Sequence, residues 1–272
     1  MSPFVAKLSA ISEKNRSLVC VGLDPDPAKF PESVRTGADP LYSFNRAIIE
    51  QTADLVCAYK LNLAFYEVQG PRGLEAMERT IRTIPDDVVI IGDAKRGDID
   101  NTARMYAKAL FEYYRFDAAT VNPYQGRDSV QPFLDYQDRG VFILCLNSNA
   151  SAREFQDLNV NGHPLYMEVA LAAQRWNEHG NAGLVVGATN ATGLTQIRSA
   201  APDMPMLIPG IGAQGGDLAT VVRTGVNAAG SGILINASRS ILYASSGADF
   251  AQASRQAAMD LKDEINRLNA GA

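Results

Sequence analysis

Short apolar runs rich in β-branched residues recur along the whole chain, and each is followed by a loop and then by a segment with helical spacing. Strands that are buried on both faces of a parallel sheet have this continuous apolar character. The runs cover residues 18–23, 55–61, 88–92, 117–121, 141–146, 183–187, 205–208 and 228–235. Eight strands alternating with helices predict an α/β protein with a closed (β/α)8 architecture, the TIM barrel.

The segments between the runs carry the helices of this fold. Helical spacing is clearest over residues 41–50, 100–111, 166–176 and 218–224. The alanine-rich, amphipathic tail over 248–268 predicts a C-terminal helix that closes the barrel. No Pro/Ser-rich linker, charge block or low-complexity segment divides the chain. Since barrels of about 250 residues commonly form one domain, we expect residues 1–272 to form a single domain.

Polar residues tend to follow the carboxyl ends of the apolar runs. They are Asp24, Lys60, Asn62, Asp93, Lys95, Asn122, Asn147, Ser148, Thr189 and Arg239, and the run over 205–208 is followed by the glycine turn Gly210–Gly212. In a (β/α)8 barrel the carboxyl ends of all the strands meet at one face, which carries the active site. The sequence therefore predicts a catalytic site at this face.

Composition excludes several other classes of protein. The chain is 46% apolar and 20% charged with a formal net charge of −5, so it has no overall basic field that would attract nucleic acid or anionic lipid. No stretch approaches the roughly 18 apolar residues of a membrane-spanning helix. The first residues also lack the apolar core of a signal peptide. We therefore expect a cytoplasmic protein without nucleic-acid or membrane partners.

The three cysteines do not indicate a metal or thiol site. Cys20, Cys57 and Cys145 lie far apart within apolar runs, and no pair has metal-ligand spacing. We expect all three to be small buried residues.

The run from Asp93 to Asp98 has the strongest chemical signature. Asp93 and Lys95 are two residues apart at a strand end, where both side chains can project together. Lys60 stands inside the preceding apolar run, where a lysine is costly unless it is paired. We therefore predict an alternating array Lys60–Asp93–Lys95–Asp98 that keeps Lys95 protonated in a dry site. Alternatively, the residues form a solvated charge cluster with an Asp N-cap, and Lys60 reaches the surface.

A glycine-rich turn predicts a phosphate site. Residues 209–218 contain four glycines between a strand and a helix, so backbone N–H groups can approach a ligand closely and the helix N-terminus favours an anion. Arg239, after the last run, can contact the same phosphate through a charge-assisted fork. Phosphate sites in this part of the barrel face recur in the fold.

With these residues assembled, the sequence resembles the orotidine 5′-phosphate decarboxylase family, in particular its longer bacterial members. The matching stretches are Val21–Pro25, Lys60–Glu67, Asp93–Ile99, Thr120–Tyr124, Pro209–Gly216 and Ser238–Ile241. The resemblance covers nearly the whole chain. It implies loss of CO2 from orotidine 5′-monophosphate to give UMP in pyrimidine biosynthesis, with neither cofactor nor metal.

The resemblance also implies roles for individual residues. Lys95 would donate a proton to C6 of the pyrimidine, and Asp93 would face the substrate carboxylate. Asp24 and Lys60 would hold ribose hydroxyls. Asp98, counted with these as catalytic, would reach the partner subunit's site together with Ile99 and Thr102, which requires a homodimer. The remaining substrate-binding residues that the resemblance implies are Asn62, Asn122, Ser148 for the pyrimidine amide, Gly212, and Gln214 and Arg239 for the phosphate.

One position departs from the shorter members of the family. Ser238 stands before Arg239, where they have glycine, and its backbone N–H remains available to a phosphate.

Two other functions are compatible with the same pattern. A metal-dependent sugar-phosphate decarboxylase of the same barrel group shares the Asp-x-Lys-x-x-Asp spacing, although no extra carboxylate for magnesium is evident. The chain could also be a nucleotide-binding barrel without catalytic activity, although it retains the full set of charged residues.

Overall fold

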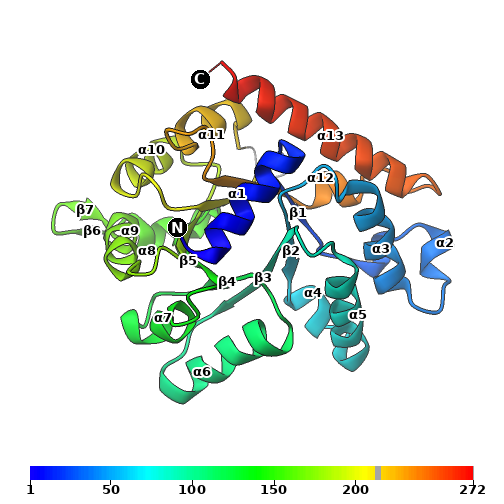
Figure 1. Cartoon of the computed structure of the whole chain (residues 1–272), viewed down its shortest axis with the longest axis horizontal. Helices are drawn as coiled ribbons and strands as arrows, with labels where there is room; N and C mark the ends of the chain where they lie inside the picture. Colours follow the sequence, from blue (N-terminus) through cyan, green and yellow to red (C-terminus); the bar gives the residue numbers. More distant parts are fainter. Residues whose placement is uncertain (212–215, 272) are drawn as a thin grey trace.

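The computed structural model describes residues 1–211 and 216–271. Its centre is a closed barrel of parallel strands in the order β1-β10-β9-β8-β5-β4-β3-β2, with helices around it (Figure 1). The barrel strands are β1 (Val19–Gly22), β2 (Ala58–Asn62), β3 (Val89–Arg96), β4 (Ala118–Val121), β5 (Gly140–Leu146), β8 (Ala182–Val186), β9 (Met206–Pro209) and β10 (Ile233–Ala237). The predicted (β/α)8 fold is confirmed.

Seven strands lie where the sequence predicts them, but the last prediction begins too early. Residues 228–232 form a turn instead of the start of a strand, and β10 begins at Ile233. Gly230 and Gly232 have φ angles of 67° and 80°, and Asn227 Oδ1 accepts hydrogen bonds from the backbone N–H groups of Ala229 and Ser231. A left-handed, Asn-centred turn of this kind is incompatible with a strand.

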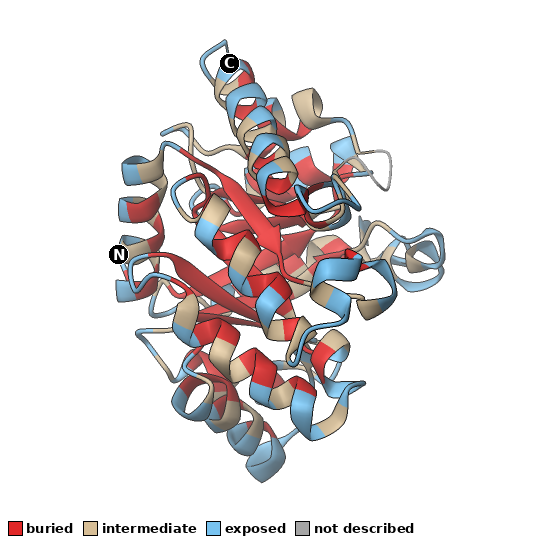
Figure 2. Cartoon of the chain, turned by 90° about the vertical axis from the view of Figure 1, so that its right-hand side faces the viewer, coloured by how far each residue is buried: buried red, intermediate tan, exposed pale blue. Residues whose placement is uncertain are grey.

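Helices cover the outside of the barrel. Figure 2 shows the strands almost wholly buried, while the helices have buried inner faces and exposed outer faces. The helices are α1 (Pro3–Asn15), α2 (Glu32–Arg35), α3 (Pro40–Thr52), α4 (Ala64–Glu67), α5 (Gly70–Thr83), α6 (Asp100–Lys108), α7 (Arg127–Leu134), α8 (Arg153–Gln156), α9 (Leu165–Trp176), α10 (Ala191–Ala200), α11 (Leu218–Gly225), α12 (Arg239–Leu242) and α13 (Phe250–Asn269).

The shorter elements complete this list. Two 3-10 turns, η1 (Pro27–Lys29) and η3 (Ala150–Ala152), lie in loops, and a π-helical turn, η2 (Ala109–Tyr113), continues α6. A small hairpin of β6 (Asn159–Val160) and β7 (His163–Pro164) lies outside the barrel.

The predicted C-terminal helix is confirmed as α13, which packs against α3 and α11. Among the described residues, no helix is both long enough and apolar enough to cross a membrane. The three cysteines are buried and free, as predicted.

An additional helix that was not predicted, α1, lies across the amino-terminal end of the barrel (Figure 1). The Phe4 ring packs edge-on against Phe142 at 5.9 Å between centroids, and Lys7 forms a 2.7 Å ion pair with Asp117. A Cβ on Gly140 would lie 2.5 Å from the Phe4 ring, so this glycine makes room for the helix. With this end covered, the opposite face is left to hold the site.

Candidate active site

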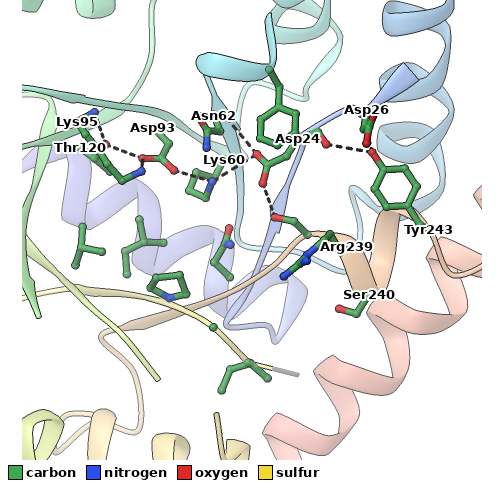
Figure 3. A pocket seen from close by; sticks show the side chains of 18 of the residues that line it. Asp24, Asp26, Lys60, Asn62, Asp93, Lys95, Thr120, Arg239, Ser240 and Tyr243 are labelled. Carbon is green, nitrogen blue, oxygen red and sulfur yellow. Dashed lines mark hydrogen bonds and ion pairs between the residues drawn. The ribbon is translucent and has the colours of Figure 1, made fainter. Parts of the chain in front are cut away.

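Four charged side chains at the ends of three neighbouring strands form a continuous row at the carboxyl face (Figure 3). Lys60 Nζ lies 3.0 Å from Asp93 Oδ2 and 3.6 Å from Asp24 Oδ1, and Lys95 Nζ lies 2.6 Å from Asp93 Oδ1. Parallel pairing sets the order, because β2 lies between β1 and β3 and Asn62 is paired with Asp93. We call Asp24, Lys60, Asp93 and Lys95 the charge row.

The row is buried at its centre and open at the Lys95 end. The side chains of Lys60 and Asp93 are 5% and 9% exposed, whereas that of Lys95 is 48% exposed. Burial acts to raise the pKa of Asp93, but Lys60 and Lys95 outweigh it and hold this pKa well below its ordinary value. Burial likewise acts to lower the pKa of Lys60, and Asp24 and Asp93 reverse this and raise it. The central pair therefore stays ionised at neutral pH.

The sequence predicts the contact between Asp93 and Lys95, but the backbone reaches it in a different way. The pairing of β3 with β4 shifts register between Gly92 and Arg96, and Lys95 has a φ of 46°. The two side chains therefore do not meet through regular strand alternation. Left-handed backbone at a residue with a Cβ is uncommon in proteins overall. The instances that do occur are concentrated at active sites.

Thr120 and Ser238 support the charge row through hydrogen bonds, a role that was predicted for neither residue. Thr120 Oγ1 donates to Asp93 Oδ1 at 2.9 Å and accepts from Lys95 N at 3.0 Å. Ser238 Oγ donates to Asp24 Oδ2 at 2.8 Å. Only the position of Thr120 at the end of an apolar run, where the polar residues gather, could have indicated it.

The charge row lines a cavity of about 340 Å³; Lys95 lies at one end of the row, and Arg239 lies beyond Asp24 at the other (Figure 3). Arg239 is exposed at the start of α12, and no described carboxylate lies within ion-pair distance of it. The cavity is also lined by Asn62, Asn236, Ser240, Tyr243, Gly210 and Ile211.

The glycine-rich turn is only partly described. Gly212 and Gln214, both predicted to bind substrate, lie outside the described residues. Gly210 has a φ of 104°, a conformation that favours glycine. Asp217 caps α11 by accepting a hydrogen bond from Ala219 N at 3.1 Å. This carboxylate satisfies one N–H group at the start of α11, and anion binding at the turn and helix start stays a prediction.

Five other predicted residues do not line this cavity within one chain. Asp98 Oδ1 accepts from Ile99 N at 2.8 Å, and no ion pair joins Asp98 to Lys95 in the described part of the chain. The row thus continues to Asp24, and Asp98 is not its fourth member. Ile99 and Thr102 are exposed at the start of α6.

Asn122 and Ser148 lie beyond other strand ends. Asn122 Oδ1 accepts from Tyr124 N at 3.0 Å. Ser148 lines a separate cavity of about 620 Å³ with Asn147, Thr189 and Asn190, next to the ends of β5 and β8. Their predicted contacts with substrate stay predictions.

Comparison with known proteins adds an independent line of evidence. The sequence model of the orotidine 5′-phosphate decarboxylase / HUMPS family matches residues 17–254. A Roseiflexus sp. (strain RS-1) protein named orotidine 5′-phosphate decarboxylase is 49% identical over 265 residues, 97% of each chain. A Cellvibrio japonicus protein of the same name is 48% identical, covering 97% of this chain and 98% of its own.

A solved structure agrees with the two sequence relatives. The structure of Leishmania donovani OMP decarboxylase matches with a TM-score of 0.87 at 40% identity, covering 99% of this chain and 100% of that one. With a family model over most of the chain and relatives near half identity over its full length, the chain belongs to the orotidine 5′-phosphate decarboxylase / HUMPS family.

Proposed function

We propose that this chain decarboxylates orotidine 5′-monophosphate to UMP and CO2 in pyrimidine biosynthesis, with Lys95 as the proton donor. The observation that carries the proposal is one cavity that holds the charge row, with Lys95 at one end and Arg239 toward the other. A nucleotide monophosphate has two matching ends, a reactive base and a phosphate. The direct test is the ultraviolet absorbance of the substrate, which changes on turnover and stays constant for a protein that only binds it.

The reaction needs a proton where CO2 leaves. The bond between C6 and the carboxylate breaks, the electron pair remains on C6, and the ammonium of Lys95 transfers a proton there. Asp93 is ionised and borders the position of the substrate carboxylate in this assignment. The two negative charges raise the energy of the bound substrate, and loss of CO2 relieves this repulsion.

Local charge alone does not supply the acceleration. A unit charge 4 Å from a carbanion contributes about 4 kcal/mol at an effective dielectric of 20, and proton transfer adds roughly 3–5 kcal/mol for a rate factor of 10²–10⁴. The largest enzymatic accelerations correspond to about 23 kcal/mol or more. Binding energy from the phosphate end must therefore contribute at C6, and we assign the phosphate to Arg239.

We further propose a homodimer in which Asp98, Ile99 and Thr102 complete the partner subunit's site. Exposed apolar side chains of Ile99, Met105 and Tyr124 support this surface. The turn before Ile99 lies beside the start of the segment that carries Tyr124, since a Cβ on Gly97 would lie 3.2 Å from Asn122. A surface with several exposed apolar residues is typical of an interface.

Mixing two inactive variants tests the shared site. If Asp98 serves the partner, a hybrid of a Lys95→Ala chain and an Asp98→Ala chain has one wild-type site and one doubly changed site. Random reassociation should restore about a quarter of the wild-type sites, since half the dimers are hybrids with one intact site each. No gain in activity after mixing, with hybrid dimers shown by mass spectrometry, would refute the shared site.

The metal-dependent alternative is tested with EDTA. Activity that is lost with the chelator and restored by magnesium would favour it.

We propose a cytoplasmic location on the evidence of three buried free thiols, which suit a reducing compartment.

A further inference from the structure

Thr120 lies in β4, between the residues paired with Gly92 and Arg96, where the regular pairing with β3 is interrupted. It is 1% exposed, and its side-chain hydroxyl contacts two parts of β3 at once. Because a backbone N–H can only donate, the hydroxyl accepts from Lys95 N at 3.0 Å and must give its single proton to Asp93 Oδ1 at 2.9 Å. The directions of both hydrogen bonds are therefore fixed.

The two hydrogen bonds act on the two features of β3 that are hardest to maintain. Lys95 has left-handed backbone, which the surrounding structure must hold in place. Its N–H falls within the register shift between Gly92 and Arg96, and the Thr120 hydroxyl takes the place of a backbone acceptor. Asp93 can rotate about its side-chain bonds, and the hydroxyl fixes the oxygen that also receives Lys95 Nζ.

We infer that Thr120 is a positioning residue for the proton donor: its hydroxyl holds both the backbone of Lys95 and the carboxylate of Asp93 in the geometry that delivers the proton. The inference rests on the proposed role of Lys95. Thr120 acts through these two residues and needs no contact with substrate. Its removal should therefore affect the chemical step and leave binding at the phosphate end intact.

Thr120→Val tests the inference, since valine has nearly the same shape but no hydroxyl. A displacement of about 1 Å at a reacting group can reduce the rate by about 10²-fold, so we expect kcat to fall by about that factor. KM and the Kd for UMP measured by calorimetry should change by less than about threefold, because the phosphate end is untouched. Thr120→Ser keeps the hydroxyl and should retain kcat within about fivefold.

A second pair covers the case in which valine prevents folding. Thr120→Ala and Thr120→Ser differ by one hydroxyl and leave similar space, so the alanine variant should show the large loss of kcat and the serine variant should not. Equal kcat for these two variants would overturn the inference, as would a Thr120→Val variant that raises KM at unchanged kcat.

Lys95→Ala, assayed alongside, separates the proton-donor role of Lys95 from the positioning role of Thr120. Near-normal turnover by Lys95→Ala would refute the proposed proton donor itself. An inactive Lys95→Ala variant together with a Thr120→Val variant of wild-type kcat would refute only the positioning role.

Discussion

The two ends of the cavity differ in how fully their side chains are already paired and positioned before substrate binds. At the charge row, Lys60 and Asp93 are buried and paired at 3.0 Å. The hydroxyl of Thr120 contacts both Asp93 and Lys95. At the other end Arg239 is exposed and has no described ion-pair partner. The proposed reacting groups are thus preorganised, while the proposed contact between Arg239 and the phosphate would form only on binding. This division suits an enzyme that uses binding energy far from the reacting carbon.

The largest effect on kcat should follow from removing Lys95, the proposed proton donor in the charge row. Lys95→Ala should fold and still bind UMP, while kcat falls by at least about 10⁴-fold, the upper range for a general acid. Steady-state absorbance assays and calorimetry with UMP measure the two quantities. Loss of UMP binding comparable to the loss of kcat would show that Lys95 serves mainly to bind and would remove the contrast between the two ends.

At the open end, Arg239→Ala should lower kcat/KM by about 10²–10³-fold, since hydrogen bonds to a charged group contribute roughly 1.5–3 kcal/mol each. The loss should occur although Arg239 is remote from C6 in the proposed binding mode. Arg239→Lys is the matched control and should recover part of it, because lysine keeps the charge but not the fork. A change under threefold in Arg239→Ala would refute the phosphate assignment.

Stability should depend on the buried end alone. Lys60→Met leaves Asp24 and Asp93 facing each other without their shared cation and should lower the free energy of unfolding by about 3–5 kcal/mol. Arg239→Ala should change it by less than about 0.5 kcal/mol. Urea denaturation of both variants measures the difference, and equal losses would contradict the comparison.

The same pair gives a pH dependence. The pKa of Asp93 in the folded protein lies below its unfolded value of about 3.9, so its carboxylate stabilises the fold above that pH and the stabilisation is lost as the pH falls further. In Lys60→Met the pKa of Asp93 rises, so less stability should be lost between pH 5 and pH 3. Denaturation at both pH values, with wild type alongside, measures the change.

Much of this site could be predicted from the sequence because its signals are local. Lys60 inside an apolar run requires a buried partner, and the neighbouring run supplies Asp93. The two hydrogen bonds that Thr120 makes to β3 could not be predicted, since they depend on a break in strand register and a left-handed φ at Lys95.

Other differences from the prediction lie outside this contact. The sequence does contain a signal for α1: Ser2 is a helix cap, Pro3 is a first-turn proline, and Phe4, Leu8 and Ile11 follow at helical spacing. Asp98 was placed in the array by sequence spacing, but its side chain folds back onto Ile99 N.

The smallest effect should come from Ser238, which joins the two ends because it binds Asp24 and directly precedes Arg239. Ser238→Ala should raise KM by about 3–10-fold at similar kcat, because a partly exposed hydrogen bond to a carboxylate contributes about 1 kcal/mol. Gly22→Ala should reproduce this effect or exceed it, since the added Cβ would lie 1.9 Å from Ser238 Oγ and displace the hydroxyl.

Two double variants decide whether this effect passes through Asp24. Gly22→Ala/Ser238→Gly relieves the clash without restoring the hydroxyl, so its KM should match that of Ser238→Ala and not that of wild type. In an Asp24→Ala background, Ser238→Ala should add nothing further, because the hydroxyl has already lost its acceptor. A full additional loss of kcat/KM in that background would mean that Ser238 acts on the substrate directly, and the connection between the charge row and the phosphate end would then run through the ligand and not through the protein.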